Sequence, residues 1–504
     1  MNCITYLRPK QAQRIPSLSS RSFYMLLILM LGACVQPSTD TNRSSEDLRP
    51  NAAKPDAPMN CLVIVLDAFH ATKSSLYGYP EKTTPHIDQW AEKGVVFEDM
   101  VSQYTSTSGS TWSYLNGQYP YRIEKFAANR PQDVPLASLF NAAGYRCGGF
   151  SDNPFINRSL RMDRGFTHFE YYKYDKSVLL LKNAQESSPD PEDFERPRNE
   201  ISELLTTQLR DWVVNDESEP WFAYLHTLRP HNPYPPEEPW LNKFTDTSVV
   251  PGDQEPQDYL IELENKFWVD NYMQRDVSDP EQLRLMHDTY LSNILYTDHL
   301  VDSLLKSLQE EGQLDNTLVI IMSDHGEAFG EHNNSNHGGT PYRELNHVPF
   351  IVIPPTHMNI DPRRVEESVE LVDLLPTLTE LFELDDPIER DGQSLIPLLR
   401  GHEGYQKEFR YSQSRWQIAV FDKTQKLILS LNTTEASPIR TPEQYDLAAD
   451  PFEKENVFGP NENDTTLLGL ARGYIARQNG TPLPEEPNLS LEELEILKSL
   501  GYVD

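Results

Sequence analysis

Acidic and imidazole side chains follow two long apolar runs of this sequence. The run 61–66 leads into Asp67, and the run 317–322 leads through one serine into Asp324 and His325. Carboxylate and imidazole groups are common ligands of divalent cations, and this mixture suits Ca²⁺, Mn²⁺, Zn²⁺ or Mg²⁺. A single aspartate after a strand is more often a turn or a helix cap. The three side chains together predict a site for one divalent metal ion.

The apolar patterns around these side chains predict the elements that must position them. Continuous apolar runs are typical of strands buried on both faces, and spacings of three and four residues are typical of helices. Strands are expected at 61–66, 145–150, 221–225, 317–322 and 349–353, and helices at 85–93, 108–115, 281–310 and 371–382. This alternation predicts an α/β fold, with a mostly parallel central sheet and helices on both faces. Ligands of such sheets bind at the carboxyl ends of the strands, where the three side chains lie.

The pattern changes after residue 404. Short strand-like runs at 410–412, 417–421 and 426–431 are separated by turn residues, which predicts a small antiparallel sheet. We therefore expect a larger α/β domain over 59–404 and a C-terminal α+β subdomain over 405–504. The segments rich in proline and acidic residues, expected to be surface insertions, are 183–200 and 235–257.

The beginning of the sequence has the pattern of an export signal. Basic residues precede the apolar run 23–31, which is too short to span a bilayer as a helix. The segment 31–34, Leu-Gly-Ala-Cys, resembles a bacterial lipobox, which implies a signal peptide over 1–33 and diacylation of Cys34. Residues 34–58 are rich in small and polar types, as in a flexible tether. We expect an exported lipoprotein of the bacterial cell envelope, at the outer membrane or its periplasmic face. An ordinary secretory signal with an incidental cysteine is the alternative.

Charge and cysteine content restrict the partners. The formal net charge is −33 at pH 7, a negative field that excludes nucleic acid as a partner. An anionic substrate is compatible with this charge, because a cation in a cleft reverses the sign locally. Two cysteines, Cys61 and Cys147, lie in the body of the chain within strand-like runs. A disulfide and two free buried thiols both stay open.

Several motifs follow one another in an order that resembles the sulfatase family of the alkaline phosphatase superfamily. The resemblance covers about 60–504, and its motifs are specific by their order rather than singly. They are 322–332 with its Asp-His-Gly-Glu core, 84–88 with 94–97, 117–120, 230–234, 337–339, 372–377, 391–395 and 445–451. It implies an alkaline-phosphatase-like fold and a hydrolase of sulfate or phosphate esters. The substrate would be a sulfated or phosphorylated small molecule, glycan or lipid.

The resemblance places the nucleophile at Thr107. Sulfatases carry a Cys or Ser there that becomes formylglycine, with Pro or Ala two residues on and Arg four residues on. This chain has Gly109 and Thr111 at those positions, so formylglycine is not expected. A Thr nucleophile, as in related phosphodiesterases and phosphoethanolamine transferases, needs activation by a metal, which makes Thr107 a metal ligand as well. Ser106 and Ser108 adjoin it, and a shift by one residue stays open.

Three histidines complete the set that the resemblance implies. His231 and His337 would bind the oxygens of the substrate or protonate its leaving group, and His226 would assist in substrate binding. In the phosphoethanolamine transferases equivalent histidines hold a second zinc, which is a further expectation here. For His226, a buried histidine without a role in the site is the alternative. The chain also departs from the family beside Asp67, where a further carboxylate is common and Leu66 stands instead.

Three functions follow from these residues. The first is a metal-dependent hydrolase of sulfate or phosphate esters that acts through a covalent Thr107 intermediate. The second is a transferase of phospho-groups to envelope lipid or glycan. The third is a non-catalytic member of the fold that binds a ligand.

Overall fold

The computed structural model describes residues 58–121, 129–172, 198–216, 220–272, 279–431, 441–459 and 465–480. The expected signal peptide, Cys34 and nearly all of the tether lie outside the described residues, as does most of the insertion 183–200. Within the described part, no helix combines the length and the apolar character needed to cross a membrane.

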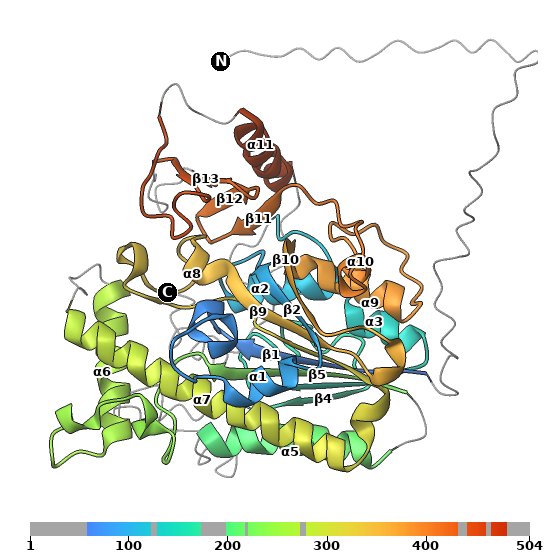
Figure 1. Ribbon diagram of the computed structural model, residues 1–504, viewed down its shortest axis with the longest axis horizontal. Coiled ribbons are helices and arrows are strands. Elements are labelled where there is room, and N and C mark those ends of the chain that lie inside the picture. Colours follow the sequence, from blue (N-terminus) through green and yellow to red (C-terminus); the bar gives the residue numbers. More distant parts are fainter. Residues whose placement is uncertain are drawn as a thin grey trace, which may run out of the picture. The chain divides into compact units, whose positions relative to one another are not determined.

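An eight-stranded sheet forms the centre of the fold (Figure 1). Strand β9 runs antiparallel to both of its neighbours, and the other pairs in the sheet are parallel. The predicted α/β class with a mostly parallel sheet is therefore confirmed. The strand order is β10 (Arg363–Glu370), β2 (Val95–Val101), β9 (His347–Ile353), β6 (Thr317–Met322), β1 (Asn60–Asp67), β5 (Trp221–Pro230), β3 (Arg146–Ser151) and β4 (His168–Tyr171).

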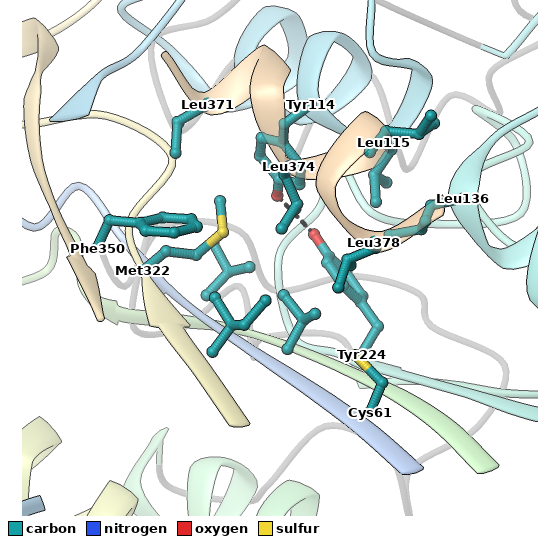
Figure 2. Close-up of a cluster of buried hydrophobic side chains, with 14 of the residues drawn as sticks. Cys61, Tyr114, Leu115, Leu136, Tyr224, Met322, Phe350, Leu371, Leu374 and Leu378 are labelled. Atoms are coloured by element: carbon teal, nitrogen blue, oxygen red, sulfur yellow. Dashed lines mark hydrogen bonds between the residues drawn. The ribbon is translucent and has the colours of Figure 1, made fainter. Parts of the chain in front are cut away.

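Helices cover both faces of this sheet, and the central strand shows why. Along β1, alternate residues enter two different apolar clusters, because successive side chains of a strand point to opposite faces. One cluster is completed by α2 (Thr107–Asn116), α3 (Leu136–Ala142), α9 (Leu374–Leu381) and α10 (Ile396–Leu399). The other is completed by α1 (Pro85–Ala91), α5 (Arg198–Val214) and α7 (Pro280–Glu310). Figure 2 shows the first cluster, in which the hydroxyl groups of Tyr114 and Tyr224 meet between apolar side chains.

A second sheet of four antiparallel strands follows in the sequence, as predicted. Its strands, in order, are β11 (Arg410–Gln413), β12 (Gln417–Phe421), β13 (Gln425–Ser430) and β14 (Glu443–Asp446). Helix α11 (Thr465–Gly480) packs its apolar side chains against β12 and β13. The main chain joins this sheet to the segment before α2, because Tyr104 pairs with Gln413 in a parallel bridge.

The remaining elements are short or lie in insertions. Helix α6 (Pro256–Tyr272) follows the acidic insertion, α8 (Arg343–Asn346) precedes β9, and β7 (Ala328–Phe329) pairs with β8 (Ser335–Asn336). Short 3-10 segments occur at Ala71–Lys73, Ser75–Tyr77, Leu241–Lys243, Thr247–Val249, Gln313–Asn316, Glu331–Asn333, Thr356–Met358 and Leu371–Asp373.

The two body cysteines are free, buried thiols. Cys61 on β1 and Cys147 on β3 both stand opposite Phe222 of β5, which lies between them. Two strand spacings separate their backbones by roughly 9–10 Å. A disulfide needs Cα atoms within about 7 Å. The register of the sheet therefore keeps the two thiols apart.

Candidate active site

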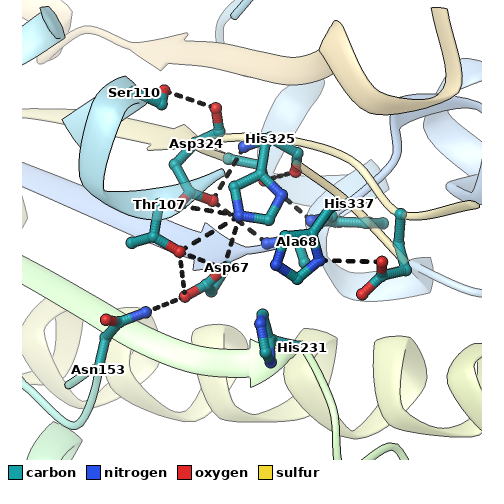
Figure 3. A network of polar contacts seen from close by, with 12 residues as sticks. Asp67, Ala68, Thr107, Ser110, Asn153, His231, Asp324, His325 and His337 are labelled. Atoms are coloured by element: carbon teal, nitrogen blue, oxygen red, sulfur yellow. Dashed lines mark hydrogen bonds and ion pairs between the residues drawn. The ribbon is translucent and has the colours of Figure 1, made fainter. Parts of the chain in front are cut away.

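Two neighbouring strands, β1 and β6, deliver three of the predicted metal ligands to one edge of the sheet. Strand β1 lies between β5 and β6 and is parallel to both, so their carboxyl ends meet. Asp67 ends β1, and Asp324 and His325 follow β6. Nε2 of His325 lies 3.4 Å from Oδ1 of Asp67 and 3.6 Å from Oδ2 of Asp324. All three side chains are 0% exposed, and Figure 3 shows them converging.

Thr107 contacts the same cluster of side chains from helix α2. It is the first residue of α2, and its Oγ1 lies 3.4 Å from each carboxylate oxygen of Asp67. Nε2 of His325 is 3.2 Å from the same hydroxyl. Thr107 is itself 0% exposed. Of the three adjacent hydroxyl residues considered above, Thr107 is thus placed where a nucleophile next to the cluster would be.

Main-chain groups hold the ligands in these orientations. Oδ1 of Asp324 accepts hydrogen bonds from the backbone N–H groups of Ala68, at 3.2 Å, and His325, at 2.9 Å. The Asp324 carbonyl accepts from the hydroxyls of Ser102 and Ser110. Nδ1 of His325 lies 2.8 Å from the carbonyl oxygen of Gly326 and therefore carries the proton. The lone pair of the His325 ring is consequently on Nε2, which faces the two carboxylates.

The electrostatics of the cluster fit a cation. Burial raises the pKa of Asp67 well above its ordinary value, the neighbouring Asp324 carboxylate raises it further, and His325 and Asn153 oppose the rise. Among the described residues, Oδ2 of Asp324 and Nε2 of His226 are buried without a hydrogen-bond partner. Hydrogen-bond acceptors that face one another in a solvent-excluded site repel. A divalent cation between these acceptors removes both the repulsion and the desolvation cost.

The spacing of the donor atoms also fits a bound divalent cation. Asp67, Asp324 and His325 offer ligand atoms that all lie within 4.8 Å of one another. The individual separations around Thr107 and His325 run from 3.2 to 3.6 Å. Ligands bound at about 2.0–2.2 Å in a tetrahedral arrangement are about 3.3–3.6 Å apart. These residues can thus hold a small divalent cation with little rearrangement.

The structure brings the three predicted histidines to this cluster in different ways. The ring centre of His337 is 4.4 Å from that of His325, and the ring centre of His231 is 4.8 Å from that of His337. Nδ1 of His337 lies 3.0 Å from Oε1 of Glu327. His231 and His337 therefore stand side by side next to the ligands (Figure 3).

His226 approaches from a different direction. It lies within β5, which extends to Pro230 and is longer than the predicted strand 221–225. Its Nε2 is 3.5 Å from Oδ2 of Asp67 and 3.8 Å from Oδ2 of Asp324. Burial lowers the pKa of His226, which favours the neutral ring. The predicted role of His226 in substrate binding stays a prediction, but the side chain faces the carboxylates.

Two residues of the site were missed by the sequence analysis. Asn153 follows β3, and its Nδ2 donates a hydrogen bond to Oδ2 of Asp67. Its signal in the sequence was the polar segment 151–153 that follows the run 145–150, which the same rule of strand ends would have selected. Glu327 stands inside the quoted Asp-His-Gly-Glu motif without an assigned role, and it orients His337.

The helix that carries Thr107 leaves no room for a larger residue at position 109. A methyl group built on Gly109 would lie 2.3 Å from Cγ of the Tyr104 ring. Tyr104 is buried and held by its pairing with Gln413, so the ring has little freedom to withdraw. The Pro or Ala of the formylglycine motif therefore does not fit at this position.

Comparisons with known proteins agree with this fold and identify the family. A family model described as Sulfatase matches residues 59–384. An arylsulfatase of Clostridium perfringens is 23% identical over 467 residues, which cover 84% of this chain and 94% of that protein. A Delta 4,5-hexuronate-2-O-sulfatase of Bacteroides thetaiotaomicron is 26% identical over 84% of this chain and 90% of that protein. The crystal structure of a phosphonate monoester hydrolase of Agrobacterium radiobacter matches with a TM-score of 0.66 at 20% identity, over 83% of this chain and 96% of that one.

The fold and the cluster of acidic, imidazole and hydroxyl groups define an ester hydrolase of the alkaline phosphatase superfamily. The matched segment spans well over half of the sequence. The chain therefore belongs to the sulfatase family, as the order of its motifs implied.

Removal of divalent cations should lower the thermal stability of the protein. Chelation would leave the buried carboxylates of Asp67 and Asp324 facing each other, and binding at 100 times the Kd contributes about 2.7 kcal/mol. Calorimetry with EDTA, and after restoring Zn²⁺, Mn²⁺, Ca²⁺ or Mg²⁺ in turn, measures the shift. The Asp324→Asn variant is the control, because its melting temperature should respond much less. An unchanged melting temperature of the wild-type protein under all conditions would contradict the metal site.

Proposed function

We propose that this chain is a metal-dependent hydrolase of sulfate or phosphate esters that acts through a covalent intermediate on Thr107. The observation that carries the proposal is the position of the Thr107 hydroxyl, 3.2 Å from Nε2 of His325 and 3.4 Å from the Asp67 carboxylate. A threonine hydroxyl is a weak nucleophile unless its surroundings favour the alkoxide. A buried hydroxyl among these groups has no other evident purpose.

The first half of the reaction is an in-line displacement. A bound divalent cation would supply positive charge that lowers the pKa of the Thr107 hydroxyl and neutralises the ester oxygens. The start of α2 adds its free N–H groups and its dipole, which favour negative charge at that end of the helix. Oγ1 of Thr107 forms a bond to phosphorus or sulfur while the bond to the leaving oxygen breaks. Asn153 donates a hydrogen bond from Nδ2 to Oδ2 of Asp67 and so helps to hold this carboxylate beside Thr107.

The leaving oxygen needs a proton, and two histidines stand where one would be delivered. His231 and His337 adjoin the ligands without being among the proposed metal ligands, and their ring centres are 4.8 Å apart. Either can act as the general acid in this step. Glu327 holds Nδ1 of His337, which directs Nε2 of that ring away from Glu327.

The second half releases the group from Thr107. A threonine ester requires a second displacement by water, whereas a formylglycine hemiacetal can eliminate sulfate. This requirement favours phosphoryl over sulfuryl transfer. The named relatives include both sulfatases and a phosphonate monoester hydrolase, so both ester classes belong in the assay. The substrate is a sulfated or phosphorylated small molecule, glycan or lipid.

The covalent intermediate is open to direct detection. We expect intact-mass spectrometry of acid-quenched protein to show one added sulfuryl, phosphoryl or phenylphosphonyl group during turnover of p-nitrophenyl sulfate, p-nitrophenyl phosphate or p-nitrophenyl phenylphosphonate, respectively. Thr107→Ala should abolish the adduct and lower kcat by about 10³-fold or more, because the nucleophile is gone. Ser108→Ala is the matched control, because it removes a neighbouring hydroxyl. This variant should still form the adduct and should keep the wild-type kcat.

The other functions have distinct results in this experiment. An adduct that is released by added alcohols in preference to water would indicate the transferase. Absence of turnover, adduct and bound metal in the wild-type protein would leave only the non-catalytic, ligand-binding member of the fold.

The general acid can be identified from the dependence of kcat on the pKa of the leaving group. We expect His337→Ala or His231→Ala to lower kcat by about 10²-fold for alkyl esters, whose alkoxides need protonation. The same variant should have a small effect on p-nitrophenyl esters, whose phenolate leaves unaided. Rates along a series of leaving groups of rising pKa identify which histidine is responsible. Equal losses for all leaving groups in both variants would show that neither histidine donates the proton.

The location of the protein is a separate proposal, supported by the sequence 31–34. We propose that Cys34 is diacylated and that the chain is anchored at the bacterial cell envelope through a flexible tether. Wild-type protein expressed in a bacterium should partition into the detergent phase with the membrane fraction, and Cys34→Ala should be recovered in the soluble periplasmic fraction or remain unprocessed. Recovery of wild-type protein as a soluble, unacylated chain would contradict the anchor.

A further inference from the structure

His226 presents a buried nitrogen to the cluster of carboxylates. The residue is 0% exposed, and among the described residues its Nε2 forms no hydrogen bond. That atom nevertheless lies 3.5 Å from Oδ2 of Asp67 and 3.8 Å from Oδ2 of Asp324. The Asp324 oxygen that it faces also lacks a hydrogen-bond partner within the described part of the chain. Two adjacent orphaned polar atoms are costly in a dry interior unless something binds between them.

A chain of hydrogen bonds decides which nitrogen of His226 carries the proton. The hydroxyl of Tyr114 donates to Oγ1 of Thr111 at 3.2 Å. The Tyr224 hydroxyl oxygen lies 2.7 Å from that of Tyr114, which has already used its one proton. Tyr224 must therefore donate to Tyr114.

Tyr224 then has no proton left for His226, whose Nδ1 lies 2.9 Å away. Nδ1 of His226 must be the donor, and in the neutral ring the lone pair is on Nε2. The lone pair thus points at the carboxylate oxygens of Asp67 and Asp324. The two carboxylate oxygens and the Nε2 lone pair repel one another. A cation between the three atoms would be coordinated by all of them, which removes the repulsion.

We propose that Nε2 of His226 is a direct ligand of the same cation that Asp67, Asp324 and His325 bind. This inference rests on the proposed metal-dependent function and gives His226 a role other than substrate binding. The separations of 3.5 and 3.8 Å from the carboxylate oxygens match those that His325 makes, at 3.4 and 3.6 Å. Both imidazoles face Oδ2 of Asp324, and they face different oxygens of Asp67, His325 the Oδ1 and His226 the Oδ2.

The identity of the cation follows from this set of ligands. Two imidazole nitrogens beside two carboxylates favour Zn²⁺ and other transition metals, whereas Ca²⁺ and Mg²⁺ prefer oxygen ligands throughout. The two carboxylates balance the charge of a divalent cation, so the filled site is neutral before an ester binds. The geometry thus assigns a transition metal, with Zn²⁺ first.

The hydrogen-bond chain orients His226, and its two tyrosines lie in the apolar cluster between the sheet and the helices that cover one of its faces (Figure 2). Without the Tyr224 hydroxyl, Nδ1 of His226 loses its acceptor and the ring can adopt the other tautomer. Without the Tyr114 hydroxyl, Tyr224 is free to donate to Nδ1 and would force the proton onto Nε2. Groups that orient a ligating histidine typically contribute 10- to 100-fold to metal affinity.

Metal binding by the full chain tests the inference without reference to activity. Apo protein is titrated with Zn²⁺ against a chromophoric chelator, and Co²⁺-loaded protein is examined by visible absorption. We expect His226→Gln to weaken Zn²⁺ binding by about 100-fold and to change the Co²⁺ spectrum. Tyr224→Phe and Tyr114→Phe should weaken Zn²⁺ binding by about 10-fold or more, although neither side chain touches the metal.

Matched controls separate these effects from a general loss of structure. Tyr77→Phe removes a hydroxyl that bonds the Phe97 carbonyl, and His347→Gln removes a buried imidazole that faces the Glu98 carbonyl. Both should leave the Zn²⁺ affinity unchanged. X-ray absorption of zinc-loaded wild-type protein counts the imidazole ligands without any substitution, and two are expected.

Each result bears on a different claim. Zn²⁺ affinity and a Co²⁺ spectrum that are unchanged in His226→Gln, or a single imidazole in the wild-type absorption data, would overturn the role of His226 and leave the ester hydrolase intact. A wild-type protein that binds no transition metal under any condition would overturn both. Preference for Ca²⁺ over Zn²⁺ in the wild-type titration would also overturn the assignment of two nitrogen ligands.

Discussion

The structure depends on the placement of two carboxylates, Asp67 and Asp324, in a dry position at the end of the central strands. Neither is exposed to solvent, and burial together with the second charge opposes ionisation of Asp67. Such a pair is unstable unless positive charge is delivered between the two groups. The parallel register of β1, β5 and β6 brings Asp67, Asp324 and His325 together, with His226 alongside, so that a cation can supply that charge.

The surroundings of this pair are arranged to keep the ligands from rotating. Asp324, His325 and His226, three of the proposed ligands, each have one atom engaged by the protein and another that faces the centre of the cluster. Asp324 uses Oδ1 on two backbone N–H groups, and His325 uses Nδ1 on a carbonyl oxygen. His226 uses Nδ1 on a tyrosine hydroxyl, which makes the apolar core part of the site. Polar groups inside an apolar cluster are costly without partners, and the Tyr114–Tyr224 pair has a hydrogen-bond partner at both ends, Thr111 and His226.

The small antiparallel sheet contributes to the same site from a distance in sequence. The backbone N–H of Arg415, between β11 and β12, donates to the carbonyl of Gly338, which follows His337. Gly338 in turn lies against Ser106, at the beginning of α2. His332, in the loop between the ligands and His337, faces Glu344 with one nitrogen and the Glu453 carbonyl with the other. The C-terminal sheet thus holds the loop that carries His337, and the two parts form one functional unit.

The sequence predicted those features that are local, and failed where the information was distant. Asp67, Asp324 and His325 were found because each follows an apolar run, and runs of that type are strands irrespective of their partners. Thr107 has no such local mark, and only the spacing of the family motifs selected it. The reversed direction of β9 and the position of Cys61 two strands from Cys147 depend on sheet order, which no local pattern contains. His226 was assigned to substrate binding, which stays a prediction; the contact of its Nδ1 with the Tyr224 hydroxyl depends on the three-dimensional fold and has no local signal in the sequence.

A threonine in place of formylglycine imposes a requirement on the rest of the site. The ring of Tyr104 occupies the space that the residue at position 109 would need for the modification motif, and the proposed mechanism therefore uses the unmodified hydroxyl. In that mechanism the ester formed on Thr107 has to be attacked by water from the side that the leaving group has vacated. An in-line mechanism puts the departing oxygen and the incoming water at the same place, opposite Thr107. The group that protonates the departing oxygen must then deprotonate the incoming water. The rings of His231 and His337 lie side by side next to the proposed ligands, and in the proposed mechanism one of them carries the proton in both halves of the cycle.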